Sequence, residues 1–175
     1  SAIAVPGNLL QEPSWEGTAL YPLYWGQSGE IGGVVNGRGG ADGITFPVLG
    51  GEAQVWQDFS TVPGQNYAIR FAYFTGGARV LVSWDDRDVG VAEIPPDEGS
   101  YWHWGSFTAY ASNTTSRINF KNLGPMFANV AMDGFSVTLS TDHPRIITQP
   151  SPFSVVAGGS AAFIVGVAGS PTLSY

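Results

Sequence analysis

The sequence contains no cysteine, little charge of either sign and no long apolar run. Without cysteine there is no disulfide framework, and two scattered histidines make a zinc centre equally unexpected. No stretch of 18 apolar residues occurs, so no segment is predicted to span a membrane. One lysine and six arginines stand against 14 acidic residues, and the net charge of −7 would repel a phosphate backbone. Nucleic acid is therefore excluded as a partner, whereas a neutral or cationic partner, or a calcium ion, fits better.

The absence of cysteine also bears on where the protein works. Secreted eukaryotic domains of this kind often carry disulfides, so their absence favours a bacterial exported protein, although it also permits a cytosolic one. The low charge and the loops rich in Gly, Ser, Thr and Asn favour export. We therefore expect a secreted, extracellular or cell-surface location and a bacterial source.

Helical patterns are scarce as well, and the composition favours β structure. The chain has 24 glycines and 12 prolines, and no stretch of helical period persists beyond about two turns. Aromatic residues, at 13%, outnumber charged residues, at 12%, a balance typical of an all-β sandwich with many short strands. A chain of 175 residues suits one domain, or one domain and a fragment.

The clearest β pattern runs from Ala53 to Phe74. Apolar and polar side chains alternate on both sides of a Pro63-Gly64 turn, which predicts two antiparallel strands that each bury one face. In this interpretation Trp56 and Arg70 lie on neighbouring strands and point away from the core. Further strands are predicted at residues 31–35, 44–49, 78–84, 89–94, 101–109, 114–120 and 130–137.

Several motifs, in order along the chain, resemble the galactose-binding-like jelly rolls, a superfamily that holds many carbohydrate-binding modules. The resemblance covers roughly Asn8 to Leu139 and implies a two-sheet antiparallel jelly roll of about nine strands. The motifs are Asn8-Leu9-Leu10, Trp15-Glu16-Gly17, Gln57-x-Phe59-x-x-Val62-Pro63-Gly64-x-x-Tyr67-x-Ile69-x-Phe71, Trp102 ahead of Phe107-Thr108-Ala109, Ile118-x-Phe120, and Val130 to Val137.

The resemblance also implies a structural calcium ion that pins the first strand to the last. The family's two usual carboxylates fall on Glu16 and Asp133 of this sequence. Calcium takes six to eight oxygen ligands, many of them backbone carbonyls, so two carboxylates can suffice. The alternative for Glu16 is a solvated loop glutamate. The chain departs from the family pattern at Glu12-Pro13, which replaces Asn-Gly, and at Gly134, which replaces a second Asp.

Catalytic constellations are poorly represented, so we predict that the protein is not an enzyme. The histidines are His103 and His143, and no nucleophile motif accompanies them. A glycosidase would need two carboxylates across a cleft, one of them with a raised pKa. The candidates lie mostly in turns where water keeps them ionised, among them a run of aspartates at a predicted hairpin tip. They are Asp58, Asp85, Asp86, Asp88, Glu93, Asp97 and Glu98.

The aromatic residues point instead to stacking chemistry. Six tryptophans and seven tyrosines are more than one core of this size needs. Exposed indole planes bind the apolar faces of sugar rings, while neighbouring polar side chains contact the hydroxyls. The alternative for each tryptophan is core packing. Our hypothesis is a non-catalytic polysaccharide-binding module of a secreted multidomain protein, with Trp25, Trp56, Arg70, Trp84 and Trp104 as candidate ligand-binding residues.

The composition shifts near residue 140, so we assign residues 1–140 to the jelly roll and 141–175 to a linker and an incomplete immunoglobulin-like segment. The stretch from Val155 to Val165 resembles the first strands of a bacterial immunoglobulin-like domain, but it is too short to close a sandwich core. We expect it to dock on its own jelly roll or on a neighbouring chain by strand addition. This leaves a second hypothesis, a structural subunit of an extracellular adhesin, sheath or filament that self-associates through the C-terminal segment.

Overall fold

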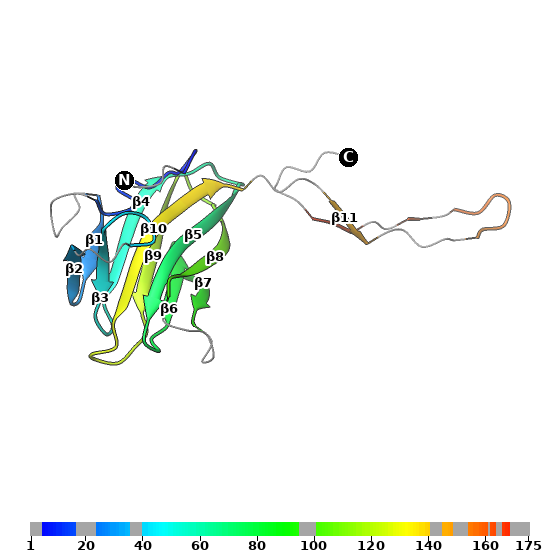
Figure 1. The fold of residues 1–175 in the computed structure, drawn as a ribbon. Helices are drawn as coiled ribbons and strands as arrows, with labels where there is room; N and C mark the ends of the chain where they lie inside the picture. The colour runs from blue at the N-terminus through cyan, green and yellow to red at the C-terminus, as the bar shows by residue number, and fades with distance from the viewer. Residues whose placement is uncertain are drawn as a thin grey trace.

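The computed structural model describes residues 5–16, 24–35, 40–94, 101–140, 145–148, 154–160, 162–163 and 166–168. Within these ranges the chain is all-β, and two five-stranded antiparallel sheets face each other (Figure 1). The predicted jelly-roll β-sandwich is confirmed, with ten strands in its two sheets rather than about nine. The described part of the chain contains no helix long and apolar enough to cross a membrane.

The two sheets are named here after their central strands. The β4 sheet has the order β1-β4-β9-β6-β7, and the β5 sheet has the order β2-β3-β10-β5-β8. The β4 sheet consists of β1 (Gly26–Ser28), β4 (Gln54–Ser60), β9 (Thr115–Asn122), β6 (Val80–Trp84) and β7 (Arg87–Ala92). The β5 sheet consists of β2 (Ile31–Val35), β3 (Thr45–Leu49), β10 (Val130–Leu139), β5 (Asn66–Thr75) and β8 (His103–Tyr110).

Strands β4 and β5 alternate as the sequence predicts, but they do not pair with each other. Strand β4 pairs with β1 and β9, whereas β5 pairs with β8 and β10 in the opposite sheet. The Pro63-Gly64 turn therefore crosses between sheets, and the Gly64 N–H donates to Ala111 O (2.8 Å) in another loop. The prediction that these strands are neighbours, with Trp56 beside Arg70, was wrong because alternation shows which side chains are buried, not which strands pair.

The core lies between the sheets and is rich in aromatic rings. Phe71 of β5 and Phe135 of β10 both contact Phe120 of β9 from the opposite sheet, with ring centroids 4.9 and 5.0 Å apart. All three are fully buried. Ile118, two residues before Phe120 on β9, is also fully buried. Because large rings remove much apolar area from water, these contacts contribute strongly to the stability of the sandwich.

A bulge in β10 changes which residues face the core. Asp133 pairs with Ala72 and Ser136 pairs with Arg70, so two residues of β10 oppose one residue of β5. Gly134 occupies the bulge with φ of 55°, a left-handed conformation that glycine adopts without steric cost. As a result Phe135 enters the core, while Asp133 faces the outer side of the β5 sheet.

The hairpin of β6 and β7 has a tighter turn than the sequence predicts. Its two-residue loop is Asp85-Asp86, and both residues have positive φ (49° and 61°), as a type I′ turn requires. The Asp85 carboxylate accepts hydrogen bonds from the Arg117 N–H (2.8 Å) and the Ser116 hydroxyl (3.1 Å). Asp85 therefore anchors the turn to β9 instead of lying free in solvent.

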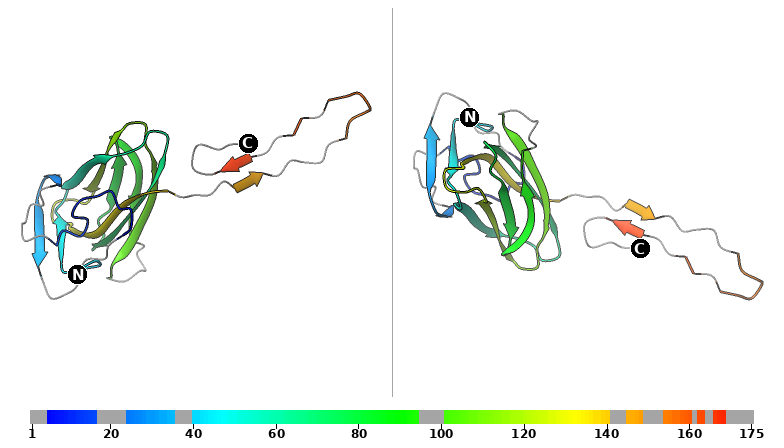
Figure 2. Two further views of the ribbon diagram at one scale, coloured as in Figure 1. Left: turned by 90° about the horizontal axis from the view of Figure 1, so that it is seen from above. Right: turned by 90° about the horizontal axis from the view of Figure 1, so that it is seen from below.

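The two described strands of the C-terminal segment do not extend either sheet of the sandwich. Strand β11 (Arg145–Thr148) pairs with β12 (Gly166–Ala168) in a separate two-stranded sheet. Figures 1 and 2 show this pair lying away from the sandwich. The expectation that the segment adds a strand to its own jelly roll was wrong for these described strands. Its likeness to an immunoglobulin domain and its docking on a neighbouring chain stay predictions.

A buried asparagine yields a test of the fold. Asn122 is fully buried, and its amide donates to Leu49 O (3.0 Å), Gly50 O (3.0 Å) and Ala128 O (2.6 Å). Replacing Asn122 with alanine leaves these carbonyls without their donor, and we expect a loss of about 3 kcal/mol in the free energy of unfolding, measured by urea denaturation. Asn119→Ala, on the outer face of the same strand, is the control and should change stability by only about 0.5 kcal/mol. Equal losses in the two variants would contradict the assignment.

Candidate functional site

The five candidate ligand-binding residues lie in three separate places. Trp25 and Trp84 are in the core, only 6% and 3% exposed, which contradicts their predicted role in sugar stacking. Trp25 packs against Phe135 with ring centroids 4.9 Å apart, and Trp84 stacks on Tyr67 at 5.6 Å. The predicted ligand-binding roles of these two tryptophans were wrong because their rings are buried in the core. The sequence pattern alone does not reveal that burial.

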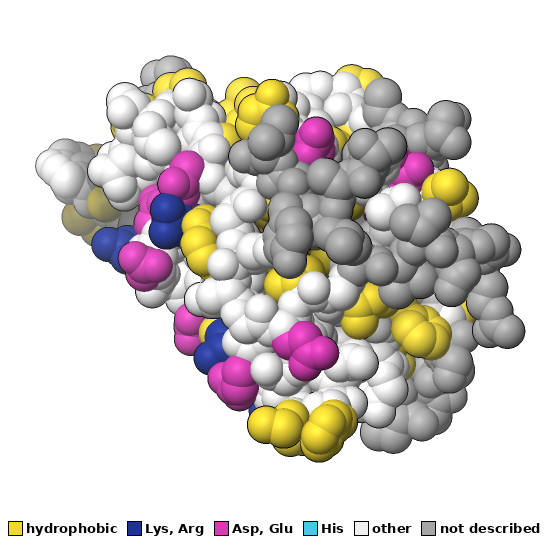
Figure 3. Space-filling view, turned by 90° about the vertical axis from the view of Figure 1, so that its left-hand side faces the viewer, with side chains coloured by type: hydrophobic (Ala, Val, Ile, Leu, Met, Phe, Trp, Pro, Cys, Tyr) yellow, Lys and Arg dark blue, Asp and Glu magenta, His cyan; other side chains and the backbone are white. Residues whose placement is uncertain are grey.

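Trp56 lies on the outer face of the β4 sheet and is half-buried. A Cβ on Gly26 would overlap its indole, so the ring lies flat over strand β1. The Arg117 guanidinium stands 5.7 Å from the ring centroid and forms a two-pronged pair with Asp58 (2.6 and 2.7 Å). The hydrogen bond from Arg117 holds the pKa of Asp58 below its usual value. Figure 3, which faces the β1 and β2 end of the sandwich, shows basic side chains beside acidic ones along its left margin.

Trp104 and Arg70 lie together on the outer face of the β5 sheet, the opposite side of the molecule from Trp56. Trp104 is 51% exposed and pairs in register with Ala72. The far edge of its indole lies 3.2 Å from where a Cβ on Gly134 would stand, so the ring extends from β8 across β5 to β10. The small side chain of Ala72 and the bare Gly134 make this flat arrangement sterically possible. The Arg70 guanidinium carbon lies 5.3 Å from the ring centroid.

More aromatic rings continue this surface on one side of Trp104. Trp102 packs edge-on to Phe46 (5.1 Å) and lies 6.2 Å from Phe74. Trp102 and Trp104 are two residues apart along the chain and share a face, as the predicted alternation requires. We call Phe46, Phe74, Trp102 and Trp104 the Trp104 platform.

Hydroxyl side chains continue the surface on the other side. Ser106 and Ser136 pair in register with Arg70 from its two neighbouring strands. Tyr110, at the end of β8, is 56% exposed and shares the face of Trp104. At a rise of about 3.3 Å per residue, the six steps from Trp104 to Tyr110 span about 20 Å. Sequence reasoning missed Tyr110, although alternation continued along β8 from Trp104 would have found it.

The predicted metal carboxylates, Glu16 and Asp133, both accept hydrogen bonds from one segment, residues 40–45, although Glu16 is exposed and Asp133 is buried. One oxygen of Glu16 accepts hydrogen bonds from the N–H groups of Ile44 and Thr45 (both 2.8 Å). Asp133 accepts hydrogen bonds from the N–H groups of Asp42 (2.7 Å) and Gly134 (2.7 Å). The loop thus links an N-terminal carboxylate to one on β10.

Glycines in this loop make room for the carboxylates. A Cβ on Gly40 would overlap the Asp133 carboxylate, and a Cβ on Gly43 would overlap that of Glu16. Gly43 also has φ of 104°, a conformation that other residues rarely adopt. Sequence reasoning missed both glycines because it treated this glycine-rich stretch as loop without a specific role.

The Asp133 carboxylate is buried among negative charges. It is completely excluded from solvent, and burial is the main reason that its pKa rises from 3.8 to about 6. The nearby charges of Asp42 and Glu16 raise the pKa further, while the two backbone N–H donors oppose the rise. No cation among the described residues contributes to this balance. An ionised Asp133 therefore lowers the stability of the folded chain unless a cation binds beside it.

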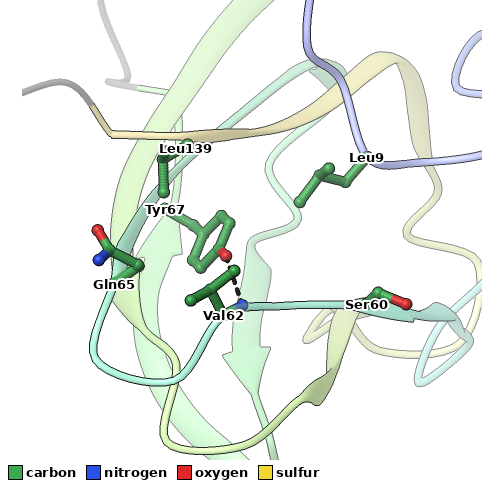
Figure 4. Close-up of a pocket in the computed structure, with 6 residues that line it drawn as sticks. All are labelled: Leu9, Ser60, Val62, Gln65, Tyr67 and Leu139. Atoms are coloured by element: carbon green, nitrogen blue, oxygen red, sulfur yellow. Dashed lines mark hydrogen bonds between the residues drawn. The ribbon is translucent and has the colours of Figure 1, made fainter.

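A separate hollow of about 390 Å³ lies at the end of the sandwich where β10 ends. Figure 4 shows the Tyr67 ring in this hollow, where its hydroxyl accepts a hydrogen bond from the Val62 N–H (2.8 Å). The six lining residues include no tryptophan and no charged side chain, so the hollow lacks the stacking surface that the Trp104 platform has. They are Leu9, Ser60, Val62, Gln65, Tyr67 and Leu139.

Comparisons with known proteins identify the fold. No protein-family model and no curated protein matches the chain. The CBM22-1 xylan-binding domain of Paenibacillus barcinonensis Xyn10C matches with a TM-score of 0.58 and 12% identity, over 78% of this chain and 97% of that one. TmCBM61, solved in complex with β-1,4-galactotriose, matches with a TM-score of 0.57 and 16% identity, over 76% of this chain and 99% of that one.

An enzyme also contains this fold as a part. The enzymatically active domain of tailspike protein 4 from bacteriophage CBA120 matches with a TM-score of 0.57 and 15% identity, over 77% of this chain but only 22% of that one. Together these likenesses confirm the predicted fold, a jelly-roll β-sandwich of the kind found in carbohydrate-binding modules. They establish the fold alone, because fold does not determine function.

The pKa of Asp133 predicts how stability depends on pH when a chelator keeps the protein free of metal. The folded chain binds this proton more tightly than the unfolded chain, whose aspartates titrate near 3.9. The stabilising contribution is therefore full below about pH 4 and is lost as the pH rises through about 6, a change of about 3 kcal/mol. Urea denaturation of the wild type and Asp133→Asn across this range isolates the effect. Parallel pH profiles for the two proteins would contradict it.

Proposed function

We propose that the protein is a non-catalytic carbohydrate-binding module that binds an extended polysaccharide on the outer face of its β5 sheet. The observation that carries this proposal is the half-exposed indole of Trp104, which lies flat across three strands beside Arg70. An immobilised ring of this kind offers a sugar an apolar surface without losing side-chain freedom on binding. The exposed Ser106, which pairs in register with Arg70, lies where its hydroxyl can contact the sugar's polar edge.

The length of this face favours a chain of sugars over a single ring. Trp104 and Tyr110 present aromatic surfaces about 20 Å apart along one strand, and both are more than half exposed. Several sugar units in a row would be needed to contact both. The ligands named for the two structural neighbours, xylan and β-1,4-galactotriose, belong to this class and support the proposal.

The described carboxylates support a binding role over a catalytic one. Asp58 is held by Arg117, and Asp85 is held by Ser116 and the Arg117 backbone. The carboxylate with the raised pKa, Asp133, is fully buried beneath a loop, where a substrate would not reach it. These three carboxylates are therefore not placed as the acid and base that a glycosidase requires. A secreted or cell-surface location and a bacterial source complete the proposal.

We further propose that Glu16 and Asp133 bind a structural calcium ion. The donor set fits, because carboxylate oxygens are the ligands that calcium prefers and a cation would offset the buried charge. Among the described residues no group of three or more His, Cys, Asp or Glu side chains is arranged to hold a metal. Backbone carbonyls would therefore supply other ligands. Bound calcium would hold the 40–45 loop against β10, next to the edge of the Trp104 indole.

The location of the binding face is tested by replacing one tryptophan on each side of the molecule with alanine. Trp104→Ala should lower affinity for a polysaccharide that the wild type binds, such as xylan or β-1,4-galactan, at least 10-fold, because stacking is lost. Trp56→Ala, on the opposite sheet, is the matched control and should leave affinity unchanged. Affinity gel electrophoresis against a panel of plant and bacterial polysaccharides measures both. Loss of binding in Trp56→Ala alone would place the site on the β4 sheet.

The calcium proposal is tested by thermal unfolding with and without a chelator. Removing calcium should lower the thermal midpoint of the wild type, because a ligand bound only to the folded state stabilises it by mass action. Asp133→Ala should abolish the difference between the two conditions, whereas Glu30→Gln, an exposed carboxylate elsewhere, should preserve it. An unchanged thermal midpoint in the wild type would overturn the proposed calcium site.

A further inference from the structure

We propose that the glycan bound on the Trp104 platform is acidic and that Arg70 binds a carboxylate or sulfate group of one sugar unit. This inference rests on the proposed function and specifies its class of ligand. An anionic group on a sugar is a strong partner for arginine, whose planar guanidinium can donate two parallel hydrogen bonds to it.

Among the described residues Arg70, like Arg79 and Arg87, forms no salt bridge, and of these three arginines it is the one that lies over an aromatic ring. Arg117 forms its pair with Asp58 (2.6 Å), and Lys121 forms one with Glu52 (2.7 Å). The described neighbour of the exposed Arg70 guanidinium is the ring of Trp104. The protein has 14 acidic residues, yet no described carboxylate forms a salt bridge with Arg70.

The contact with Trp104 orients Arg70 without using its hydrogen-bond donors. A guanidinium over an aromatic ring interacts through its charge, and its N–H groups remain directed outward in its own plane. Arg70 is thus held beside the surface on which a sugar ring would stack. The donors can reach a substituent at the edge of that sugar, where the carboxylate of a uronic acid lies.

The surrounding charges place the acidic group on one side of Arg70. The far edge of the indole and Asp42 both lie beside Gly134, and Asp42 and Asp133 are both buried. Ser106 and Ser136 flank Arg70 in register on the neighbouring strands and carry no charge. The anion would therefore lie beside the exposed Ser106, whose hydroxyl can donate a further hydrogen bond and which is away from these carboxylates.

The test compares acidic oligosaccharides with neutral forms of the same chain. The probes are oligomers of polygalacturonate and glucuronoxylan, their carboxyl-reduced counterparts, and a sulfated derivative of each reduced form. Isothermal titration calorimetry with the full chain should give about 10- to 100-fold tighter binding of an acidic oligomer than of its reduced form, as expected for a charged hydrogen-bonded pair. High salt should reduce this preference. The sulfated arm shows whether the site requires a planar carboxylate or accepts either anion.

Variants at Arg70 assign the preference to this residue. Arg70→Gln should abolish the preference for the acidic oligomer, so that the affinities for the acidic and the reduced form become equal. Arg70→Lys should retain part of it, because the charge remains while the two-pronged geometry is lost. Arg87→Gln, an exposed arginine on β7 of the other sheet, removes the same charge and should have no effect.

The two proposals fail in different ways. Equal binding of acidic and reduced oligomers, with loss of both in Trp104→Ala, would overturn the acidic-ligand inference and uphold polysaccharide binding. An acidic preference that Arg70→Gln leaves intact would also overturn the inference. Absence of binding to the acidic, sulfated, reduced and neutral probes alike would overturn both.

Discussion

Burial of aromatic rings between the two sheets is the interaction on which the rest of the structure depends. Phe71 and Phe135 of one sheet pack on Phe120 of the other, and Trp84 stacks on Tyr67 beside them. Removing these rings from water supplies much of the energy that holds the sheets together. This burial also limits which residues can bind a ligand, because a tryptophan buried in the core is not accessible from solvent.

The bulge at Gly134 connects this core to the candidate site. Two residues of β10 stand opposite one residue of β5, and this irregularity sends Phe135 inward while Asp133 faces out. The same glycine leaves the space that the Trp104 indole occupies. The bulge therefore affects the core packing, the buried carboxylate and the aromatic platform at once. Bulges often occur next to functional sites.

The outer faces of the two sheets differ in how far their polar groups are already paired. On the β4 sheet, Trp56 stacks with an arginine that Asp58 holds in place. On the β5 sheet, Trp104 stacks with Arg70, whose hydrogen-bond donors have no acidic partner among the described residues. A paired guanidinium contributes to a stable surface, whereas an unpaired one beside an exposed indole is suited to a ligand. The β5 sheet is therefore the stronger candidate for binding.

The sequence by itself determined the class of fold, the strands and the direction of most side chains, because a period of two is a local property of the backbone. It also singled out Arg70 and Trp104, and it marked Glu16 and Asp133 as a pair. Only the tertiary structure decided that β4 and β5 belong to opposite sheets, that Trp25 and Trp84 are buried, and that Gly40 and Gly43 make room for the two carboxylates. These outcomes depend on contacts between residues far apart in the chain, which alternation along a single strand does not specify.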